Sequence, residues 1–563
     1  MTQSTPPPST PLFRTHLIET LINVLMALVV IQIAVITFWF TLAEDSNGDA
    51  GRDAQLFALQ SLGKRTVGSL RTGYDQTGAY NHWLELNTLA RVAAQRGDEA
   101  AAERLRAARD RVAKLSPVLQ PPYMGDAVVE PDLAKYAAEN FVQPATALTE
   151  RFENQYRQKV QWSDKASAYT VQLTLLAVAL FMFGVAASSK RFVRVMFFGI
   201  GLALALVVLV WMLWVYFQPV SALPDEAIDA YARGEGALYQ GEAVAAIKQY
   251  DQALQLAPTY TSAYRDRGYA KYVTGDYTGA ASDLENARAN GDASSDTQSS
   301  LGYLYYLLGQ FDKAHALNRQ AAQQAPNEFW VRANYALGLL AAGKIGEAQN
   351  EYDAALSQMA QLVAAVRAQA KEPPAALWYD FDGAVSDLDT LQQCAATQAC
   401  DGAPPFASLQ NAPAIAITAT TLATKLKEHA VALEYTSKPP AGTVTATVEP
   451  FAFTRVLSDD DAEVQDTETF AATDEPIYVI TTFSGLQDGQ QLVIKVYVDG
   501  SEDDRLRVAD TYSVEEMGGA DGDIFLPITT GGVPLTPGAY RIEMYVNSKL
   551  VQRGEFSVVA ENE

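Results

Sequence analysis

Three long apolar blocks interrupt the mixed polar pattern in the first part of the chain. They span residues 17–42, 168–187 and 192–217, and each is at least as long as the roughly 20 residues that a helix needs to cross a bilayer core. The first block exceeds the apolar region of a signal peptide, so we interpret it as an uncleaved anchor. The pattern therefore predicts an integral, multi-pass membrane protein with three transmembrane helices.

The charges beside these blocks predict their orientation. The short turn between the second and third blocks carries Lys190 and Arg191, and Arg194 follows just inside the third block. Short loops rich in Lys and Arg remain in the cytoplasm. Basic residues just before the second block argue for the opposite orientation, but acidic residues follow the first and third blocks. We therefore expect residues 1–16 to form a cytoplasmic N-terminal tail, and residues 43–167 and 218–563 to be extracytoplasmic.

The 43–167 loop has a helical composition, shown by the run DEAAAERLRAARDRVAKL between Asp98 and Leu115. Long helices between two spans resemble the extracytoplasmic helical bundles of bacterial sensor proteins, and this resemblance concerns architecture alone. We expect an α-helical extracytoplasmic domain here. His82 and Trp83 are interpreted as packing residues rather than as part of a ligand site.

After the third block, small residues recur at a step of 34 residues. The step is clearest from Gly241 to Gly275, and it continues through further columns of Gly and Ala. The columns are Gly241, Gly275, Gly309 and Gly343; Ala246, Ala280, Ala314 and Ala348; Ala253, Ala287, Ala321 and Ala355; and Gly234, Gly268, Gly302 and Ala336. A bulky residue recurs at Tyr250, Leu284 and Tyr352, whereas Asn318 interrupts the third copy. This periodicity indicates stacked helical hairpins.

The repeated pattern resembles the tetratricopeptide-repeat (TPR) family over residues 227–360, with four repeats. Arg233 and Arg267 stand where the family usually has Leu, and Leu301 conforms. The resemblance implies an α-solenoid that binds a protein or peptide on its inner face. The ligand-facing columns that it implies hold Tyr231 and Arg265, Tyr269 and Tyr303, and Tyr272 and Tyr306. Packing between helices is an equally strong interpretation of these tyrosines.

The C-terminal part changes from a helical to a strand pattern. Residues 361–437 are expected to form a helical extension, followed by a linker at 438–442. In residues 443–563 apolar residues alternate with their neighbours, for example Leu492, Ile494 and Val496, which is typical of an all-β sandwich. The closing stretch LTPGAYRIEMYVNSKLVQRGEFSV resembles the last hairpin of bacterial Ig-like modules.

The chain has two cysteines, Cys394 and Cys400, within a polar stretch of the helical extension. Because a metal site usually needs four ligands, we expect these two residues to form a disulfide in an oxidising compartment. Two unrelated small residues are the alternative. The acidic run Asp459–Asp461 has no spaced ligand loop beside it, so a solvated loop is favoured over a calcium site.

Composition limits the partners and the chemistry. A net charge of −24 argues against nucleic acid, which attracts clustered basic residues. The sequence has four scattered histidines, His16, His82, His315 and His429, and lacks phosphate-loop, HExxH and CxxC motifs. We therefore predict no catalytic site, no metal site and no cofactor.

These features together predict a membrane-anchored scaffold of the cell envelope that is not an enzyme. Its repeats and Ig-like domain would bind a protein or peptide outside the cytoplasm. Two alternatives remain open. One is a receptor or sensor that uses residues 43–167, and the other is a non-catalytic subunit of an envelope enzyme complex.

Overall fold

The computed structural model describes residues 12–125, 131–369, 371–397, 409, 411–435, 444–455, 467–474, 476–514, 519–529 and 534–560. The chain folds as two units, Met1–Gly291 and Asp292–Glu563. The boundary between them lies inside the predicted repeat region. Each unit is described by itself.

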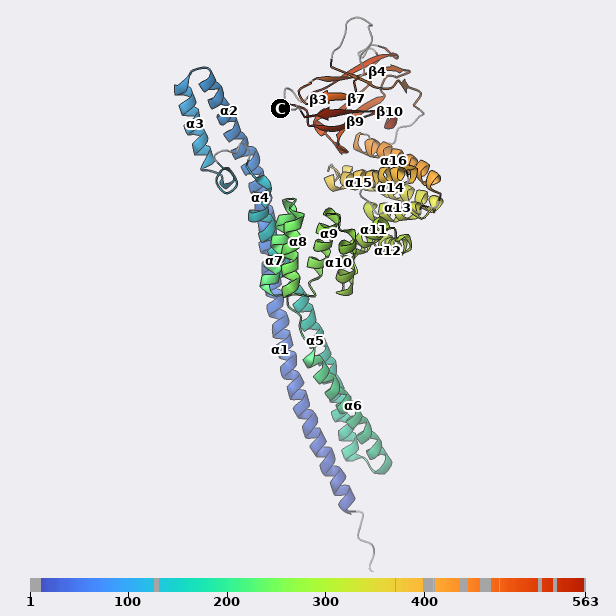
Figure 1. Ribbon diagram of the computed structural model, residues 1–563. Helices are drawn as coiled ribbons and strands as arrows, with labels where there is room; N and C mark the ends of the chain where they lie inside the picture. The colour runs from blue at the N-terminus through green and yellow to red at the C-terminus, as the bar shows by residue number, and fades with distance from the viewer. Residues whose placement is uncertain are drawn as a thin grey trace, which may run out of the picture. The chain divides into compact units, whose positions relative to one another are not determined.

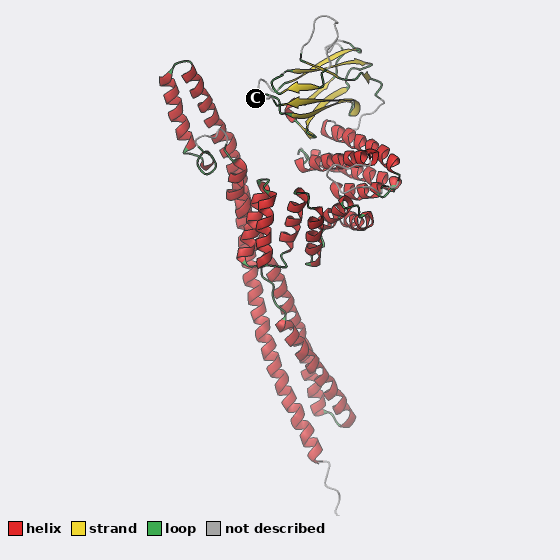
Figure 2. Ribbon diagram, viewed as in Figure 1, coloured by secondary structure: helices red, strands yellow, loops and turns green. Residues whose placement is uncertain are grey.

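Long helices form the first part of unit one (Figures 1 and 2). Their bounds are α1 Leu12–Gly73, α2 Asn81–Gln95, α3 Glu99–Ala113, α4 Leu133–Ala137, α5 Gln143–Ser188 and α6 Arg191–Phe217. Short π-helices, Tyr74–Tyr80 and Ala138–Val142, interrupt this series. Within the described chain, three helical stretches are long and apolar enough to cross a membrane: Glu19–Gln95, Leu133–Ser188 and Phe192–Phe217.

Helices α1, α5 and α6 pack together along their apolar stretches. Ile36, Leu176, Phe183 and Val208 are fully buried between them. Many other large apolar side chains of the same helices face outward, including Phe38 at 66% exposure and Phe217 at 74%. The three helices therefore combine an apolar core with an apolar outer surface.

Four helices of unit one follow the predicted repeats: α7 Asp225–Tyr239, α8 Ala243–Leu256, α9 Thr261–Val273 and α10 Tyr277–Ala289. The glycines at the 34-residue step end the first helix of each hairpin with positive φ, +77° at Gly241 and +82° at Gly275. Only glycine adopts this conformation without strain. The alanine columns are fully buried, so adjacent helices approach closely.

The first repeat packs against α5, the helix that contains the predicted span 168–187. Arg151 of α5 donates hydrogen bonds to Asp225 at 3.0 Å and to Asp229 at 2.8 Å. The Asn154 side chain accepts from the backbone N–H of Leu223 at 2.9 Å and donates to its carbonyl at 3.2 Å. These contacts fix the start of the repeat region on α5.

In unit two the helical hairpins continue as α11 Ser295–Leu307, α12 Phe311–Gln324, α13 Phe329–Ala341 and α14 Ile345–Arg367. A further hairpin, α15 Ala375–Thr397 and α16 Ala412–Tyr435, follows. Helix α15 packs against α13, and α16 packs against α14. The predicted helical extension thus repeats the arrangement of the preceding hairpins, and the predicted helical-repeat region is confirmed.

Two departures from the repeat pattern have structural explanations. Arg267 occupies a usual Leu position because its guanidinium forms ion pairs of 2.6 Å with both Asp251 and Asp283. Asn318 is fully buried, and its Nδ2 donates to the Asn334 carbonyl at 3.2 Å. The Oδ1 atom of Asn318 is buried without a hydrogen-bond partner among the described residues.

The C-terminal domain is strand-rich, as predicted, and its described strands form two sheets. In the first sheet, β4 Ile477–Ser484 pairs with β8 Gly522–Ile528 along one edge, and with β1 Thr447–Val448 and β2 Ala452–Thr454 along the other. The second sheet has the order β3 Thr469–Ala471, β10 Lys549–Val559, β9 Gly538–Val546 and β5 Gln491–Val498; β6 Ser501–Glu502 and β7 Val508–Thr511 pair with β5.

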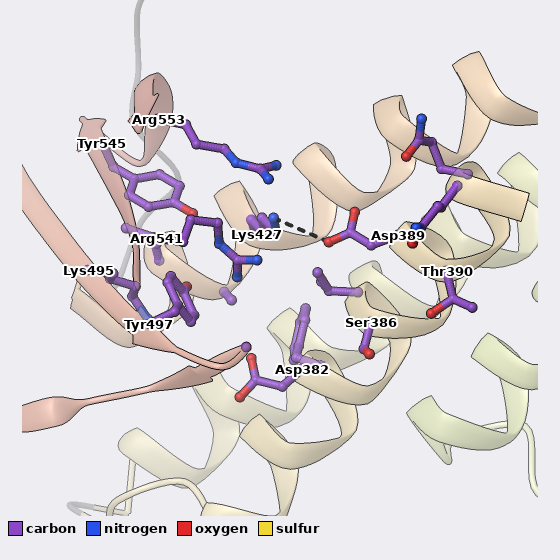
Figure 3. A pocket seen from close by; sticks show the side chains of 17 residues that line it. Asp382, Ser386, Asp389, Thr390, Lys427, Lys495, Tyr497, Arg541, Tyr545 and Arg553 are labelled. Carbon is purple, nitrogen blue, oxygen red and sulfur yellow. Dashed lines mark ion pairs between the residues drawn. The ribbon is translucent and has the colours of Figure 1, made fainter. Parts of the chain in front are cut away.

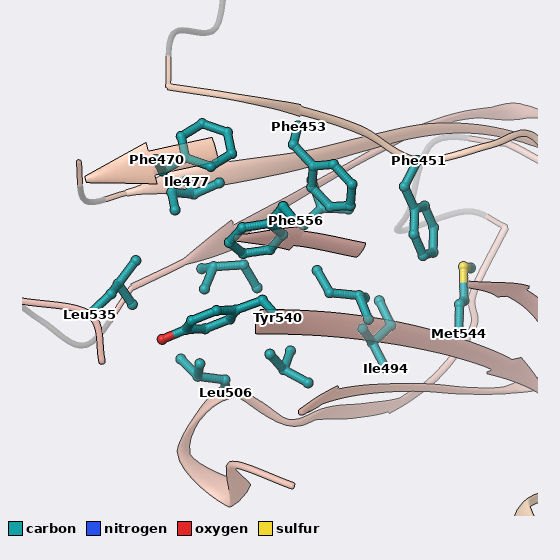
Figure 4. Close-up of a cluster of buried hydrophobic side chains, with 14 of the residues drawn as sticks. Phe451, Phe453, Phe470, Ile477, Ile494, Leu506, Leu535, Tyr540, Met544 and Phe556 are labelled. Atoms are coloured by element: carbon teal, nitrogen blue, oxygen red, sulfur yellow. The ribbon is translucent and has the colours of Figure 1, made fainter. Parts of the chain in front are cut away.

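An aromatic-rich core lies between the sheets (Figure 4). Phe453 and Tyr540 contact the Phe556 ring with centroid distances of 4.9 Å each. The alternating residues Leu492, Ile494 and Val496 of β5 belong to this core, as their spacing predicts.

The opposite face of β5 is also buried. Val493 packs with Val431 of α16 and Tyr545 of β9. A strand buried on both faces reads as a nearly continuous apolar run, and LVIKVYV in β5 has this character. The helical hairpin therefore covers the outer face of the second sheet.

The structure describes one of the two residues of the predicted disulfide. Cys394 is buried in α15, whereas Cys400 lies outside the described residues. The Asp459–Asp461 run also lies outside them. Both expectations stay predictions.

The Asn318 position generates a first prediction. Replacing Asn318 with Leu removes a buried, unpaired carbonyl oxygen and restores the side chain found at Leu284, one repeat earlier. Because such an oxygen destabilises by about 1–3 kcal/mol, N318L should slow hydrogen exchange in α11 and α12. The reverse change L284N should destabilise α9 and α10 by about 3 kcal/mol. Faster exchange in N318L would contradict this explanation.

Candidate functional site

The predicted ligand-facing residues of the first two repeats separate by accessibility. Tyr231 is buried, and its hydroxyl donates to Asp266 at 2.5 Å. Arg265 is exposed and pairs with the same carboxylate at 2.9 Å. Tyr269 is 55% exposed. Only part of this predicted surface is therefore open to a ligand without rearrangement.

Tyr231 belongs to a cluster of tyrosines and carboxylates where the first repeats meet α5. Tyr250 donates to Glu235 at 2.5 Å, and Tyr260 donates to Glu150 at 2.9 Å. The Tyr231 ring lies 5.7 Å from that of Tyr250 and 5.2 Å from that of Tyr260. Each tyrosine hydroxyl donates a hydrogen bond to a buried or half-buried carboxylate. A carboxylate in such a place is unfavourable without a hydrogen-bond donor.

Burial, and then the Asp266 carboxylate, raise the pKa of Glu235 to about 7, against the opposing hydrogen bond from Tyr250. Burial, and then Glu150, raise the pKa of Tyr260 well above its ordinary value. The tyrosine hydroxyl therefore stays protonated and acts as the donor. The cluster can change its charge near neutral pH through Glu235.

The exposed part of the predicted surface lies at the C-terminal end of α9. The ring centroids of Tyr269 and Tyr272 are 6.3 Å apart, and that of Tyr277 lies 5.9 Å from Tyr272. Val273, 53% exposed, follows directly. We call Tyr269, Tyr272, Val273 and Tyr277 the α9 aromatic patch. Such rings offer apolar area and hydroxyl groups to a peptide.

The corresponding tyrosines of unit two, Tyr303 and Tyr306, are hydrogen-bonded or buried within the chain itself. The Tyr303 hydroxyl donates to Asp387 of α15 at 2.6 Å. Tyr306 is buried. Burial raises the pKa of Asp387 to about 6, although the hydrogen bond from Tyr303 opposes this. In this unit α15 takes the contacts that the sequence assigned to a ligand.

A charged cleft separates α15 and α16 from the outer face of the second sheet (Figure 3). Its volume is about 370 Å³. The sheet contributes Lys495, Tyr497, Arg541, Tyr545 and Arg553, and α16 contributes Lys427. Nothing in the repeat pattern indicates this site, because it depends on the helical extension covering the sheet.

Ion pairs close the floor of the cleft. Lys427 pairs with the fully buried Glu543 at 2.9 Å, and Arg541 lies 3.2 Å from the same carboxylate. Lys495 pairs with Glu434 and with Glu502, each at 2.9 Å. The helical hairpin and the sandwich are thus joined by salt bridges with little access to water.

The charges around Glu543 favour its ionised form. Burial favours its neutral form, yet the charges of Lys427 and Arg541 hold the pKa of Glu543 below its ordinary value. Because this pKa is lowered in the folded protein, the pair stabilises the fold fully at pH values above the ordinary pKa of a glutamate. This stabilisation is lost as the pH falls through the lowered pKa of Glu543.

The described histidines do not form a metal site. Among the described residues, no group of three or more His, Cys, Asp or Glu side chains could hold a metal ion. His315 stacks on Tyr335 with centroids 5.6 Å apart, and the His429 ring contacts the Lys425 carbonyl at 2.8 Å. His82 lies near Glu85 at 3.3 Å, on the surface.

Known proteins are similar to the repeat region. A tetratricopeptide repeat protein 36 of Danio rerio is 33% identical over 113 residues, which is 18% of this chain and 60% of that protein. The chain thus spans less than two thirds of this relative. No family model matches the chain.

Two solved structures also align with the chain at low sequence identity. The TPR protein YrrB, described as having an unusual peptide-binding site, is 20% identical and covers 29% of this chain and 86% of its own, with a TM-score of 0.22. The Cut9–Hcn1 hetero-tetramer of APC/C contains a chain that is 14% identical and covers 72% of this chain and 98% of its own, with a TM-score of 0.24. The repeat region of the chain is TPR-like, and proteins of this type mediate protein–protein interaction.

The cleft generates a second prediction. Lys427→Met removes one partner of a buried ion pair and should destabilise unit two by about 3–5 kcal/mol. Lys549→Met removes the exposed partner of Glu428 at the same interface, and should change the stability by less than about 1 kcal/mol. Thermal unfolding of both variants measures the difference. Equal effects would show that Lys427 and Glu543 do not join the hairpin to the sheet.

Proposed function

We propose that this chain is a membrane-anchored scaffold whose TPR-like repeats bind a protein or peptide outside the cytoplasm. The α9 aromatic patch carries the proposal, because the large side chains of Tyr269 and Val273 are exposed on the repeat that follows the one packed against α5. Neighbouring tyrosines of the same columns are buried or hydrogen-bonded within the chain. The patch and Arg265 are therefore the accessible remainder of the predicted ligand-facing surface.

Membrane anchoring is supported by the outward apolar side chains of α1, α5 and α6. A water-soluble protein rarely exposes so many contiguous large apolar residues. In the hydrocarbon core of a membrane these side chains would contact lipid instead of water, so the unfavourable hydration of apolar groups would be avoided. The basic turn at Lys190, Arg191 and Arg194 supports a cytoplasmic location for the loop between α5 and α6.

This orientation places the repeats and the strand-rich domain outside the cytoplasm. We propose that the domain is Ig-like and serves as a further interaction module. A Cys394–Cys400 disulfide would suit the oxidising environment that the orientation implies. The proposed partner is a protein rather than a nucleic acid, consistent with the net charge of −24.

The orientation is tested by proteolysis of intact spheroplasts. Protease added from outside should remove residues after 218, because they lie on the outer side, while the loop at Lys190 stays protected. Cleavage of the C-terminal half only after lysis would reverse the orientation.

The α9 aromatic patch is tested by Tyr269→Ala. Loss of a central aromatic contact typically weakens binding by about 2 kcal/mol or more, so capture of the partner that crosslinks to the chain in intact membranes should weaken at least about tenfold. Tyr269 is 55% exposed, so the thermal unfolding temperature should remain nearly unchanged.

Tyr379→Ala provides a matched control, because Tyr379 is also an exposed tyrosine but belongs to α15, in unit two. It should leave capture intact. If Y269A captures the partner as well as Y379A does, the patch is not the binding surface.

A further inference from the structure

The charged cleft of unit two has two walls of opposite charge. Figure 3 shows Lys427, Lys495, Arg541 and Arg553 on the side of the strands and α16, and Asp382 and Asp389 on α15. Most of these charges already have partners. The groups that remain available decide what the cleft can hold.

Arg541 supplies the available positive charge. Its Nε atom lies 3.2 Å from Glu543, and its guanidinium lies over the Tyr497 ring at 4.3 Å from the centroid. No other described residue forms a hydrogen bond or an ion pair with its terminal nitrogens. Figure 3 shows this guanidinium directed into the cleft. A planar guanidinium with free N–H groups is suited to a carboxylate.

Asp382 supplies the available negative charge. Within the described part of the chain, no side chain donates a hydrogen bond to its carboxylate or forms an ion pair with it. Asp389 makes only a long contact of 3.7 Å with Lys427. Burial raises the pKa of Asp382, so a bound cation would favour its ionised form.

The rest of the α15 wall is polar and regularly spaced. Asp382, Ser386, Asp389, Thr390 and Gln393 follow one another at helical spacing and all line the cleft. Positions separated by three or four residues lie on the same face of a helix. Hydroxyl, amide and carboxylate groups therefore face the cations of the sheet, and Phe381, Tyr497 and Tyr545 add apolar area.

We propose that this cleft binds a small zwitterion that carries one carboxylate and one ammonium group, such as a free α-amino acid. Its carboxylate accepts hydrogen bonds from Arg541, and its ammonium group donates to Asp382 and Asp389. The cleft volume of about 370 Å³ lies in the range of small-molecule sites, about 300–1,000 Å³.

A singly charged ligand fits less well. A plain carboxylate would leave Asp382 without an ionic partner, and a plain amine would leave the terminal N–H groups of Arg541 without an acceptor, because Glu543 lies near its Nε atom. The Arg541 side chain is only 20% exposed, so N–H groups without an acceptor are unfavourable there. The zwitterion satisfies both walls at once. This ligand site is separate from the α9 aromatic patch, so the two proposals can fail independently.

The test uses the full chain in nanodiscs. The probes are the common L-α-amino acids and, as longer zwitterions, simple dipeptides. At least one should raise the thermal unfolding temperature in a concentration-dependent way and bind measurably by calorimetry. Its N-acetyl derivative, which lacks the ammonium group, and its decarboxylated amine should bind at least about tenfold more weakly.

Variants locate the site. Asp382→Asn removes the acidic group from the exposed face of α15 and should lower the affinity for the probe at least about tenfold. Asp380→Asn removes an acid from the same helix outside the cleft, and should leave binding unchanged. Arg541→Lys keeps a cation for Glu543 but loses the planar fork, and should weaken binding of the carboxylate as well.

Three results would overturn the proposal. The first is that no zwitterion binds at any accessible concentration. The second is equal binding of the amino acid and its N-acetyl or amine derivative. The third is unchanged affinity in D382N, provided that its unfolding temperature without the probe matches that of D380N.

Discussion

A hydrogen bond between a buried carboxylate and a tyrosine joins the long helix α5 to the repeat region. Glu150 lies on α5 and is buried, and it accepts a hydrogen bond of 2.9 Å from Tyr260, which precedes α9. A buried carboxylate without a partner is strongly unfavourable, so this contact favours one arrangement of the first repeats on α5. Arg151, with Asp225 and Asp229, fixes the start of α7 beside it.

This junction gives the proposed scaffold a physical basis. Helix α5 runs without a break from the repeat contacts at Glu150 to Ser188, through the stretch expected to cross the membrane. A repeat packed on such a helix would be held near the membrane, rather than suspended from a flexible linker. The α9 aromatic patch belongs to the same unit, so the proposed binding surface would share this fixed position.

The sequence predicted the parts of the fold that depend on periodicity. The apolar blocks, the small residues at the 34-residue step and the alternation in β5 each follow from one local pattern. The positions of individual tyrosines were not predictable in this way. Tyr231 and Tyr269 both belong to predicted ligand-facing columns, yet Tyr231 is buried because Asp266 and the rings of Tyr250 and Tyr260 surround it.

The charged cleft could not be predicted either. Lys427 and Glu543 are separated by more than a hundred positions, and no motif links them. One available signal was the apolar character of Val493 and Tyr497, on the face of β5 that a simple sandwich would expose to water. That signal indicates a covered sheet, but not that α16 covers it.

The junction between α5 and the repeats is tested most directly by a double-mutant cycle with Glu150→Gln and Tyr260→Phe. Unfolding free energies of the two single variants and the double variant, measured in the full chain, give the coupling between the two side chains. The account predicts a coupling of at least about 1 kcal/mol, as for residues in direct hydrogen-bonded contact. Effects that add to within about 0.5 kcal/mol would show that the two side chains act independently, and would contradict a repeat region fixed on α5.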